Sequence, residues 1–411
     1  MEQNEPTVAL IGTLDTKGVE YQWMADRLTE LGVSVVVIDA GVRPAEGFTG
    51  EVEFDNSSVA EAVATTVSAL SNGNDRGRAV TSMGEGAAVV SAGLLARDRL
   101  DGVLALGGSG GSAIAARAVR DLPVGLPKLI VSTMASGDVS PYVGASDVTL
   151  MYSVVDIAGI NRISRSVLGN AAAAIAGMAK AHRERADVVV GDRPLIGASM
   201  FGVTTPAVDA ARERLDELGY EVLVFHATGS GGRALESLTR SGMLAGVLDL
   251  TTTELADELV GGVLSAGADR LTAAGASGVP QVVSLGALDM VNFGPEATVP
   301  AEFADRQFFV HNATVTLMRT TPGENAELGR IVGEKLVGAP RTVLIIPRGG
   351  VSALDDEGMP FRDEAADDAL FDAVLAAAKG VTVIESHANI NDRDLARRAA
   401  DELHALIGAA R

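Results

Sequence analysis

The feature that most constrains the fold is an order of segments that occurs twice along the chain. A short apolar run at 8–11, a Gly/Thr loop, a helix-like stretch at 17–31 and a valine-rich run at 33–38 have counterparts after residue 195. Two further pairs follow in the same order: RLDGVLAL with MLAGVLDL, and PKLIVS with PQVVS. Three matches in one order indicate an internal duplication.

Short apolar runs alternate with helical patterns along the whole chain. Strands alternating with helices form parallel sheets that carry helices on both faces. The sequence therefore predicts an α/β protein with two doubly wound, mostly parallel-sheet, Rossmann-like domains related by internal duplication. The expected strands are 8–11, 33–38, 102–106, 128–131, 148–155, 195–200, 221–225, 246–250, 281–285, 342–346 and 381–385.

A polar stretch, HRERADVVVGDRP at 182–194, separates the two halves. The length of 411 residues fits two or three domains. We expect one α/β domain at 1–186 and a second α/β domain at 187–411.

Composition limits the classes of partner and ligand. The net charge of −21 disfavours nucleic acids and anionic membranes. The chain has no cysteine, so it has no disulfides, thiolate nucleophiles or Cys-based metal sites. The N-terminus has no signal pattern, and the longest apolar stretches are interrupted. We expect a cytoplasmic protein with no membrane partner, and a homo-oligomer on general frequency.

Ligands of open parallel sheets bind at the carboxyl ends of strands. Five loops rich in Gly, Ser or Thr are expected there in the first half: 12–18, 39–43, 82–88, 107–112 and 132–138. Small residues let a ligand approach the backbone, and hydroxyls donate to phosphate oxygens. The loop GGSGGS at 107–112 precedes a helix, whose free amides and dipole favour an anion. It matches neither a P-loop nor a dinucleotide fingerprint, so a purely structural turn is the alternative.

Charged residues in these loops allow two interpretations. Asp15 could hold a ribose hydroxyl or, through water, Mg²⁺. Lys17 at a helix start would neutralise phosphate, although Asp15 or Thr16 could instead cap the helix with Lys17 in solvent. Glu85 is either a capping residue or a ligand contact, and Arg43 could reach a phosphate.

The second half carries its own polar residues after expected strands. The candidates for acid–base catalysis are His226, Arg233, Glu254 and His311. A buried, hydrogen-bonded role is the alternative for each histidine. The spacing matches no metal motif such as HExxH, so no metal site is predicted from the protein's own residues.

Long motifs throughout the chain resemble one known family. They include ALIGTLDTKGVE, SMGEGAA, LGGSGGS and STMASGDVSPYVGASD in the first half, and HATGSGGRALESL, DLTTTELADEL and GALDMVNFG in the second. The chain is similar over essentially its whole length to the ATP-binding-domain family related to the tomato mosaic virus resistance protein. The resemblance implies ATP as the ligand of the first domain, with Mg²⁺ accompanying its phosphates, and it implies no reaction.

The resemblance carries nucleotide binding to the matching loops. The expected nucleotide-binding residues are Gly12, Thr13, Asp15, Thr16, Lys17, Gly84, Glu85, Gly86, Gly107, Gly108, Ser109, Gly110, Gly111, Ser112, Thr133, Ser136 and Gly137.

Three functions remain open at this point. The first is a two-domain ATP-binding protein. The second is an ATP-dependent or ATP-regulated enzyme acting on a small organic acid in the C-terminal domain. The third is a regulatory module whose interactions with a partner are gated by ATP.

Overall fold

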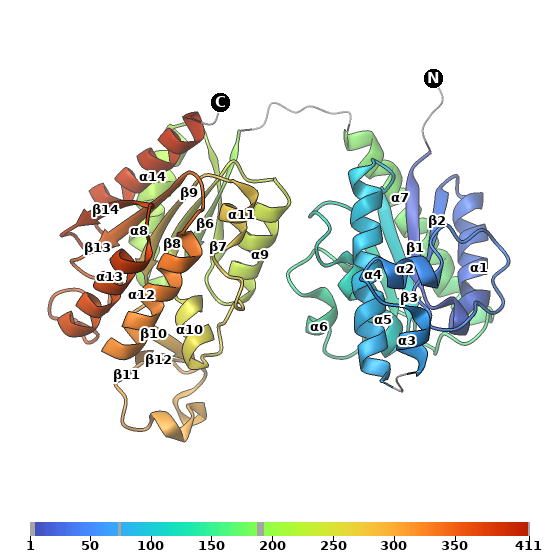
Figure 1. The fold of residues 1–411 in the computed structure, drawn as a ribbon, viewed down its shortest axis with the longest axis horizontal. Coiled ribbons are helices and arrows are strands. Elements are labelled where there is room, and N and C mark those ends of the chain that lie inside the picture. The colour runs from blue at the N-terminus through green and yellow to red at the C-terminus, as the bar shows by residue number, and fades with distance from the viewer. Residues whose placement is uncertain (1–4, 73–74, 187–192, 410–411) are drawn as a thin grey trace. The chain divides into compact units, whose positions relative to one another are not determined.

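The computed structural model describes residues 5–72, 75–186 and 193–409. It divides into two compact units, Met1–Val190 and Gly191–Arg411 (Figure 1). Each unit is built around a parallel sheet with helices on both faces, which confirms the predicted fold class. The predicted domain boundary at 186/187 adjoins residues 187–192, which lie outside the described residues.

The N-terminal unit has a five-stranded parallel sheet in the order β2-β1-β3-β4-β5. Its strands are β1 (Thr7–Gly12), β2 (Ser34–Asp39), β3 (Gly102–Gly107), β4 (Lys128–Ser132) and β5 (Thr149–Tyr152). Its helices are α1 (Leu14–Glu30), α2 (Asn56–Glu61), α3 (Val67–Asn72), α4 (Arg76–Ala96), α5 (Ser109–Val119), α6 (Ser140–Val143) and α7 (Arg162–Ala186). The five strands predicted for the first half are all present.

Two apolar layers sandwich this sheet, and β1 contributes to both. Val8 and Leu10 pack with α1 and α7, whereas Ala9 and Ile11 pack with α4 and α5. Successive side chains of a strand point to opposite faces, so a sheet covered on both sides needs apolar residues at every position. This requirement explains why β1 and β3 appear in the sequence as apolar runs, Val8–Ile11 and Val103–Leu106.

The chain leaves β1 toward β2 on one side and β3 lies on the other, so the topology reverses between β1 and β3. The two strands pair only as far as Ile11 and Ala105. Beyond that point the buried hydroxyl of Tyr21 links them: it donates to the Ile11 carbonyl (2.5 Å) and accepts from the Leu106 amide (2.9 Å). Burial raises the pKa of Tyr21 above its usual value, so the hydroxyl keeps its proton.

The C-terminal unit repeats this topology and adds one strand, in the order β14-β13-β9-β8-β6-β7. Its sheet consists of β6 (Leu195–Met200), β7 (Glu221–His226), β8 (Gly246–Thr251), β9 (Gln281–Gly286), β13 (Thr342–Pro347) and β14 (Thr382–Ser386). Its helices are α8 (Thr205–Glu217), α9 (Ser230–Arg240), α10 (Glu254–Val260), α11 (Ala273–Ser277), α12 (Pro322–Leu336), α13 (Glu364–Ala377) and α14 (Arg393–Gly408). The first five strands occupy the same relative positions as β1–β5, which agrees with duplication.

A small antiparallel sheet between β9 and α12 was not predicted. Its strands, in the order β10-β12-β11, are β10 (Met290–Phe293), β11 (Phe308–Asn312) and β12 (Val315–Arg319). Met290 and Leu317 pack with Phe201 and Phe361 in a separate apolar cluster. These strands carry polar residues, and within the described residues no α-helix separates them, so they lack the alternation of strands and helices by which the parallel strands were identified.

Among the described helices, α4 is long and apolar enough to cross a membrane by length and composition alone. In the structure α4 packs against α5, and Met83, Ala87 and Leu94 belong to the core of the N-terminal unit. Core packing therefore accounts for the apolar character of this helix.

Replacing Tyr21 with Phe should keep the ring packing and remove the link between β1 and β3. The Leu106 amide then loses its bond to the Tyr21 hydroxyl, so the free energy of unfolding should fall by about 1–3 kcal/mol. Urea denaturation measures this loss. Tyr152→Phe, at an exposed tyrosine of β5, is the matched control and should change little; equal effects of the two substitutions would contradict the role given to Tyr21.

Candidate functional site

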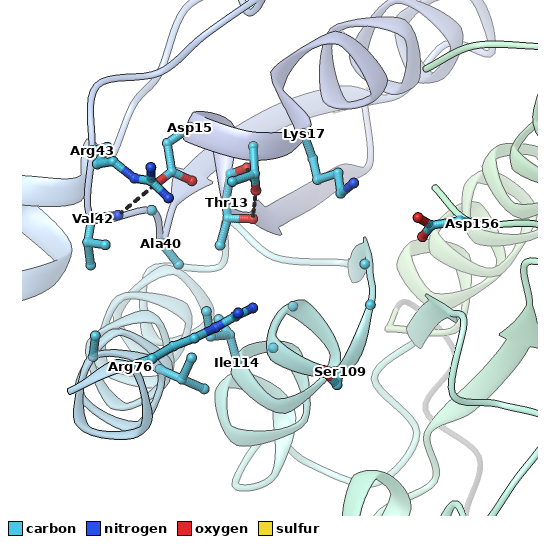
Figure 2. Close-up of a pocket in the computed structure, with 18 residues that line it drawn as sticks. Thr13, Asp15, Lys17, Ala40, Val42, Arg43, Arg76, Ser109, Ile114 and Asp156 are labelled. Atoms are coloured by element: carbon cyan, nitrogen blue, oxygen red, sulfur yellow. Dashed lines mark hydrogen bonds and ion pairs between the residues drawn. The ribbon is translucent and has the colours of Figure 1, made fainter. Parts of the chain in front are cut away.

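A cavity of about 480 Å³ opens at the carboxyl ends of β1 and β3 (Figure 2). Thr13 and residues 15–17, 40–43 and 107–111 line it together with side chains from α4, α5 and the segment after β5. The cavity lies at the point where the strand order reverses, which is where open parallel sheets bind ligands.

The glycine-rich loop forms one wall of the cavity and opens helix α5. Gly108 occupies the N-cap position and has no side chain with which to cap the helix. The first intrahelical bond runs from the Ser112 amide to the Gly108 carbonyl (2.9 Å). The amides of the three preceding residues, Ser109, Gly110 and Gly111, therefore precede the helical ladder, and the helix dipole favours an anion beside them.

Three cations line the same cavity: Lys17, Arg43 and Arg76. Figure 2 shows Arg76 reaching from the start of α4 toward the first turn of α5. Its Nη2 lies 3.5 Å from the position that a Cβ on Gly110 would take. Sequence analysis missed Arg76 because it stands in a polar stretch that follows no predicted strand.

Lys17 interrupts the first turn of α1 with non-helical backbone angles (φ −132°, ψ 19°). Its Nζ donates to the Ile157 carbonyl, so the ammonium group already has a partner at the edge of the cavity. The residue at the N-cap position is Thr13, not Asp15 or Thr16, and the hydroxyls of Thr13 and Thr16 are 2.8 Å apart. The capping alternative for Asp15 and Thr16 is therefore wrong.

Two carboxylates organise the loop that follows β2. Asp15 accepts from the Val42 amide (3.3 Å), and its Oδ2 is 3.7 Å from Nε of Arg43. Asp39, buried at the end of β2, accepts from the amides of Leu14 (3.1 Å) and Gly41 (2.8 Å). Burial raises the pKa of Asp39. Both carboxylates hold the loops after β1 and β2 together.

Asp156, which sequence analysis missed, reaches the cavity from the segment after β5. Figure 2 shows Asp156 and Lys17 directed toward one another. Just before it, Val154 has a φ of +66°, and the Val155 amide donates to the Ser153 carbonyl (2.7 Å) across it. Positive φ is an outlier for a β-branched residue, and such strain is concentrated at functional sites.

Several predicted nucleotide-binding residues lie near the glycine loop but do not line the cavity. At Gly12 an added Cβ would lie 1.9 Å from the Tyr21 ring, so this glycine makes room for the tyrosine. Ser112 is buried, with its hydroxyl 2.6 Å from that of Ser132. The Thr133 amide donates to the Gly107 carbonyl (3.2 Å). Ser136 and Gly137 follow in the turn after β4.

The prediction of a strand-end loop at 82–88 is wrong, because these residues lie inside α4. A Cβ on Gly86 would lie 2.0 Å from the Val59 carbonyl oxygen, and one on Gly84 would lie 3.1 Å from Cβ of Arg117. These glycines allow α2 and α5 to pack closely on α4. Glu85 lines a different hollow, beside Arg117. The small residues serve helix packing rather than a loop.

In the C-terminal unit the candidate Glu254 is buried and serves the backbone. It accepts from the amides of Gly229 (2.7 Å) and Gly232 (3.0 Å) and from Nε of Arg270 (2.7 Å). Arg270 is itself fully buried and also binds Asp249 (2.7 Å). Glu254 therefore acts as an internal anion that fixes the turn before α9.

The other three candidates for catalysis, Arg233, His226 and His311, contact different parts of the unit. Nη1 of Arg233 donates to the Ser265 carbonyl (2.9 Å), and His226 packs edge-on against Phe201. His311 is exposed on β11, in the small antiparallel sheet. The structure does not gather the four side chains around one cavity, so their catalytic role stays a prediction.

A buried acidic cluster joins the loops after β9 and β13 to α13. Arg319 donates to Asp367 (2.7 Å) and lies 3.8 Å from Asp355. Oδ1 of Asp289 and of Asp355 have no hydrogen-bond partner within the described part of the chain. Burial raises the pKa of Asp289 to about 6 and that of Asp355 to about 8. No group of His, Asp and Glu suited to a metal ion occurs among the residues described.

Because of this cluster, we expect the C-terminal unit to be less stable at high pH than at low pH. The folded state keeps protons on these carboxyls at pH values where the unfolded chain, with a pKa of 3.8, has lost them. The free energy of unfolding should therefore fall as the pH rises from about 5 to about 9, by at least about 1 kcal/mol. Thermal melts should show a fall of about 2–4 °C in Tm.

Asp355→Asn should reduce that pH dependence because the amide cannot ionise, and the remainder should come from Asp289 and from Asp257, whose pKa burial raises to about 7. Asp305→Asn, at an exposed position of the same unit, is the control and should leave the pH dependence unchanged. A Tm that rises from pH 5 to pH 9 would contradict the raised pKa values.

Two family models match the chain. The N-terminal domain of the Uncharacterised protein family UPF0261 matches residues 6–184, and its C-terminal domain matches residues 193–407. The UDP-N-acetylglucosamine 2-epimerase from Rickettsia bellii shows 8% sequence identity and a TM-score of 0.21, covering 68% of this chain and 78% of that one. A TM-score this low supports no conclusion about function.

Curated relatives include bacterial and plant proteins. A UPF0261 protein of Clostridium tetani is 50% identical over 403 residues, covering 96% of this chain and 98% of that protein. The ToMV resistance protein Tm-1 of Solanum lycopersicum is 40% identical over 421 residues, covering 97% of this chain but 56% of the tomato protein. The chain thus corresponds to little more than half of its plant relative. By both family models and by these identities, it belongs to the UPF0261 family.

Proposed function

We propose that the N-terminal unit binds ATP, with the phosphates in the cavity at the ends of β1 and β3. The observation that carries this proposal is the uncapped start of α5, which faces a cavity lined by Lys17, Arg43 and Arg76. Backbone amides and a helix dipole bind anions, and arginine forks match phosphate oxygens.

The charge of the cavity contrasts with that of the chain. Its lining has three cations against two carboxylates, Asp15 and Asp156, in a protein of net charge −21. A local excess of positive charge in such an acidic chain favours a ligand with several negative charges. The family resemblance adds ATP to what the loop chemistry alone supports, which is an anion.

Magnesium fits this cavity as a companion of the phosphates. Mg²⁺ keeps several waters and commonly uses one or two carboxylates together with phosphate oxygens. The carboxylate of Asp156 is exposed and lines the cavity, and within the described residues it accepts a hydrogen bond from the neighbouring Ile157 amide (2.9 Å). Asp156 is therefore the side chain that would hold the ion, which would offset charge on the phosphates.

One observation favours an ATP-gated interaction module as a second candidate. Lys17 is bound to the Ile157 carbonyl, three residues after the strained Val154. A phosphate that attracts Lys17 would release the segment after β5 and change the surface there. Catalysis by the C-terminal unit has less support, since Glu254 is engaged in backbone and Arg270 contacts.

Arg76→Ala and Gly110→Val test the placement of the phosphates. The first removes a cation, and the second puts a branched side chain beside the amides of α5. Each should weaken ATP binding by about tenfold or more, since a charge-assisted hydrogen bond contributes about 1.5–3 kcal/mol. Titration calorimetry of the full chain, with and without Mg²⁺, measures the affinity.

Arg78→Ala is the matched control, because Arg78 is an exposed arginine two residues along α4 that does not line the cavity. It should bind ATP like the unchanged protein. Undiminished affinity in both cavity variants, or equal losses in all three, would overturn this placement.

A further inference from the structure

The cavity at the start of α5 adjoins a second, larger hollow of about 810 Å³. Val42 and Arg43 line both of them. The remaining wall of the second hollow comes from α2, α3 and the segments that precede them. Because the two share these residues, a ligand anchored in the first cavity can extend past Arg43 into the second hollow.

The two spaces differ in chemistry. Half of the residues that line the second hollow have neutral hydrogen-bonding side chains: Asn56, Ser57, Thr66, Ser68 and Ser71. Among the described residues that line it, Arg43 is the only cation and Glu61 the only acid. Hydroxyls and amides both donate and accept hydrogen bonds. This wall suits an uncharged group rich in hydroxyls and ring nitrogens better than it suits a further phosphate.

The wall between the two spaces is held in place by hydrogen bonds. Asn56 Nδ2 donates to the Arg43 carbonyl (3.0 Å), which ties the loop after β2 to α2. The carboxylate of Asp55 caps α2 by accepting from the Ser58 amide (2.8 Å). The edge of the sheet reaches the same segment through the bridge between Ile38 and Phe54. The second hollow is therefore formed before any ligand arrives.

Arg43 stands at the junction of the two spaces. Its side chain is 73% exposed, and its Nε lies 3.7 Å from Asp15. A guanidinium is planar and stacks on aromatic rings as well as pairing with phosphate. This position allows Arg43 to contact a ring on one side and a phosphate on the other.

We propose that the second hollow binds the nucleoside of the ligand whose phosphates occupy the first cavity. This inference rests on the proposed function and deepens it, because it assigns the part of the ligand that distinguishes a nucleotide from an inorganic polyphosphate. The site is thus bipartite, with a cationic cavity for phosphates and a neutral polar hollow for sugar and base.

The test compares ATP with inorganic tripolyphosphate by calorimetry on the full chain. The unchanged protein should bind ATP at least about tenfold more tightly than tripolyphosphate, because only ATP reaches the second hollow. Ser68→Trp should fill that hollow, weaken ATP by about tenfold and leave tripolyphosphate within about twofold. Ser166→Trp, at an exposed serine of α7 outside both spaces, is the control and should change neither affinity.

Each outcome separates the inference from the function on which it rests. Equal affinities for ATP and tripolyphosphate in the unchanged protein would contradict the assignment of the nucleoside to the second hollow. They would not affect the assignment of the phosphates to the first cavity. Equal losses for both probes in Ser68→Trp would also contradict the assignment of the nucleoside. Binding of neither probe to the unchanged protein would overturn the proposed function itself. The comparison of the two probes on the unchanged protein holds even if Ser68→Trp fails to fold.

Discussion

The parting of β1 and β3 beyond Ile11 and Ala105 is the constraint on which the rest of the N-terminal unit depends. Where two parallel strands separate, their last backbone groups need new partners, since a buried unpaired group is costly. Tyr21 supplies them between the strands, and Asp39 supplies them for the loop that follows. The amides at the start of α5 precede the helical ladder instead, and they face the cavity.

In the C-terminal unit, a buried side chain binds backbone amides at the strand ends. The repeat aligns Gly102–Leu106 with Gly246–Leu250, which sets Glu254 opposite Gly110. Where the first unit has a bare glycine beside an open cavity, the second has a carboxylate that binds the Gly229 and Gly232 amides. The negative charge beside these amides therefore comes from the protein's own Glu254. The duplication therefore produced two sheets of the same order with different strand ends.

The parallel sheets could be predicted from the sequence because their central strands are buried on both faces. Val8 to Ile11 is apolar at every position, and in the C-terminal unit single polar residues such as Asp249 and Ser284 stand within apolar runs. The antiparallel strands β10–β12 carry polar residues such as Asn292 and Thr316, which are buried in the structure. A buried polar residue looks in the sequence like a surface one, so these strands could not be recognised.

The candidate site was predictable where it lies on strand-end loops and not where it is assembled by packing. Thr13, Lys17 and Gly107–Gly111 follow apolar runs directly, and they do line the cavity. Arg76 lies within the long segment between β2 and β3 and follows no strand. It reaches the cavity because α4 packs on α5. Gly84 serves that packing and Gly86 serves the packing of α2 on α4, which is why helix contacts resembled a ligand loop in the sequence.

The strand ends of the two units also differ in the groups that a bound anion would have to displace. In the N-terminal unit a phosphate would compete with the Ile157 carbonyl for Lys17, and the amides of α5 lie at the cavity. In the C-terminal unit an anion would have to displace Glu254, which would leave the fully buried Arg270 short of a partner. Breaking a buried ion pair on one side costs about 3–5 kcal/mol. Arg270 would keep Asp249 and Glu236 as partners, so the cost here is smaller. An anion should still prefer the first unit, because the second has already filled the position with its own carboxylate.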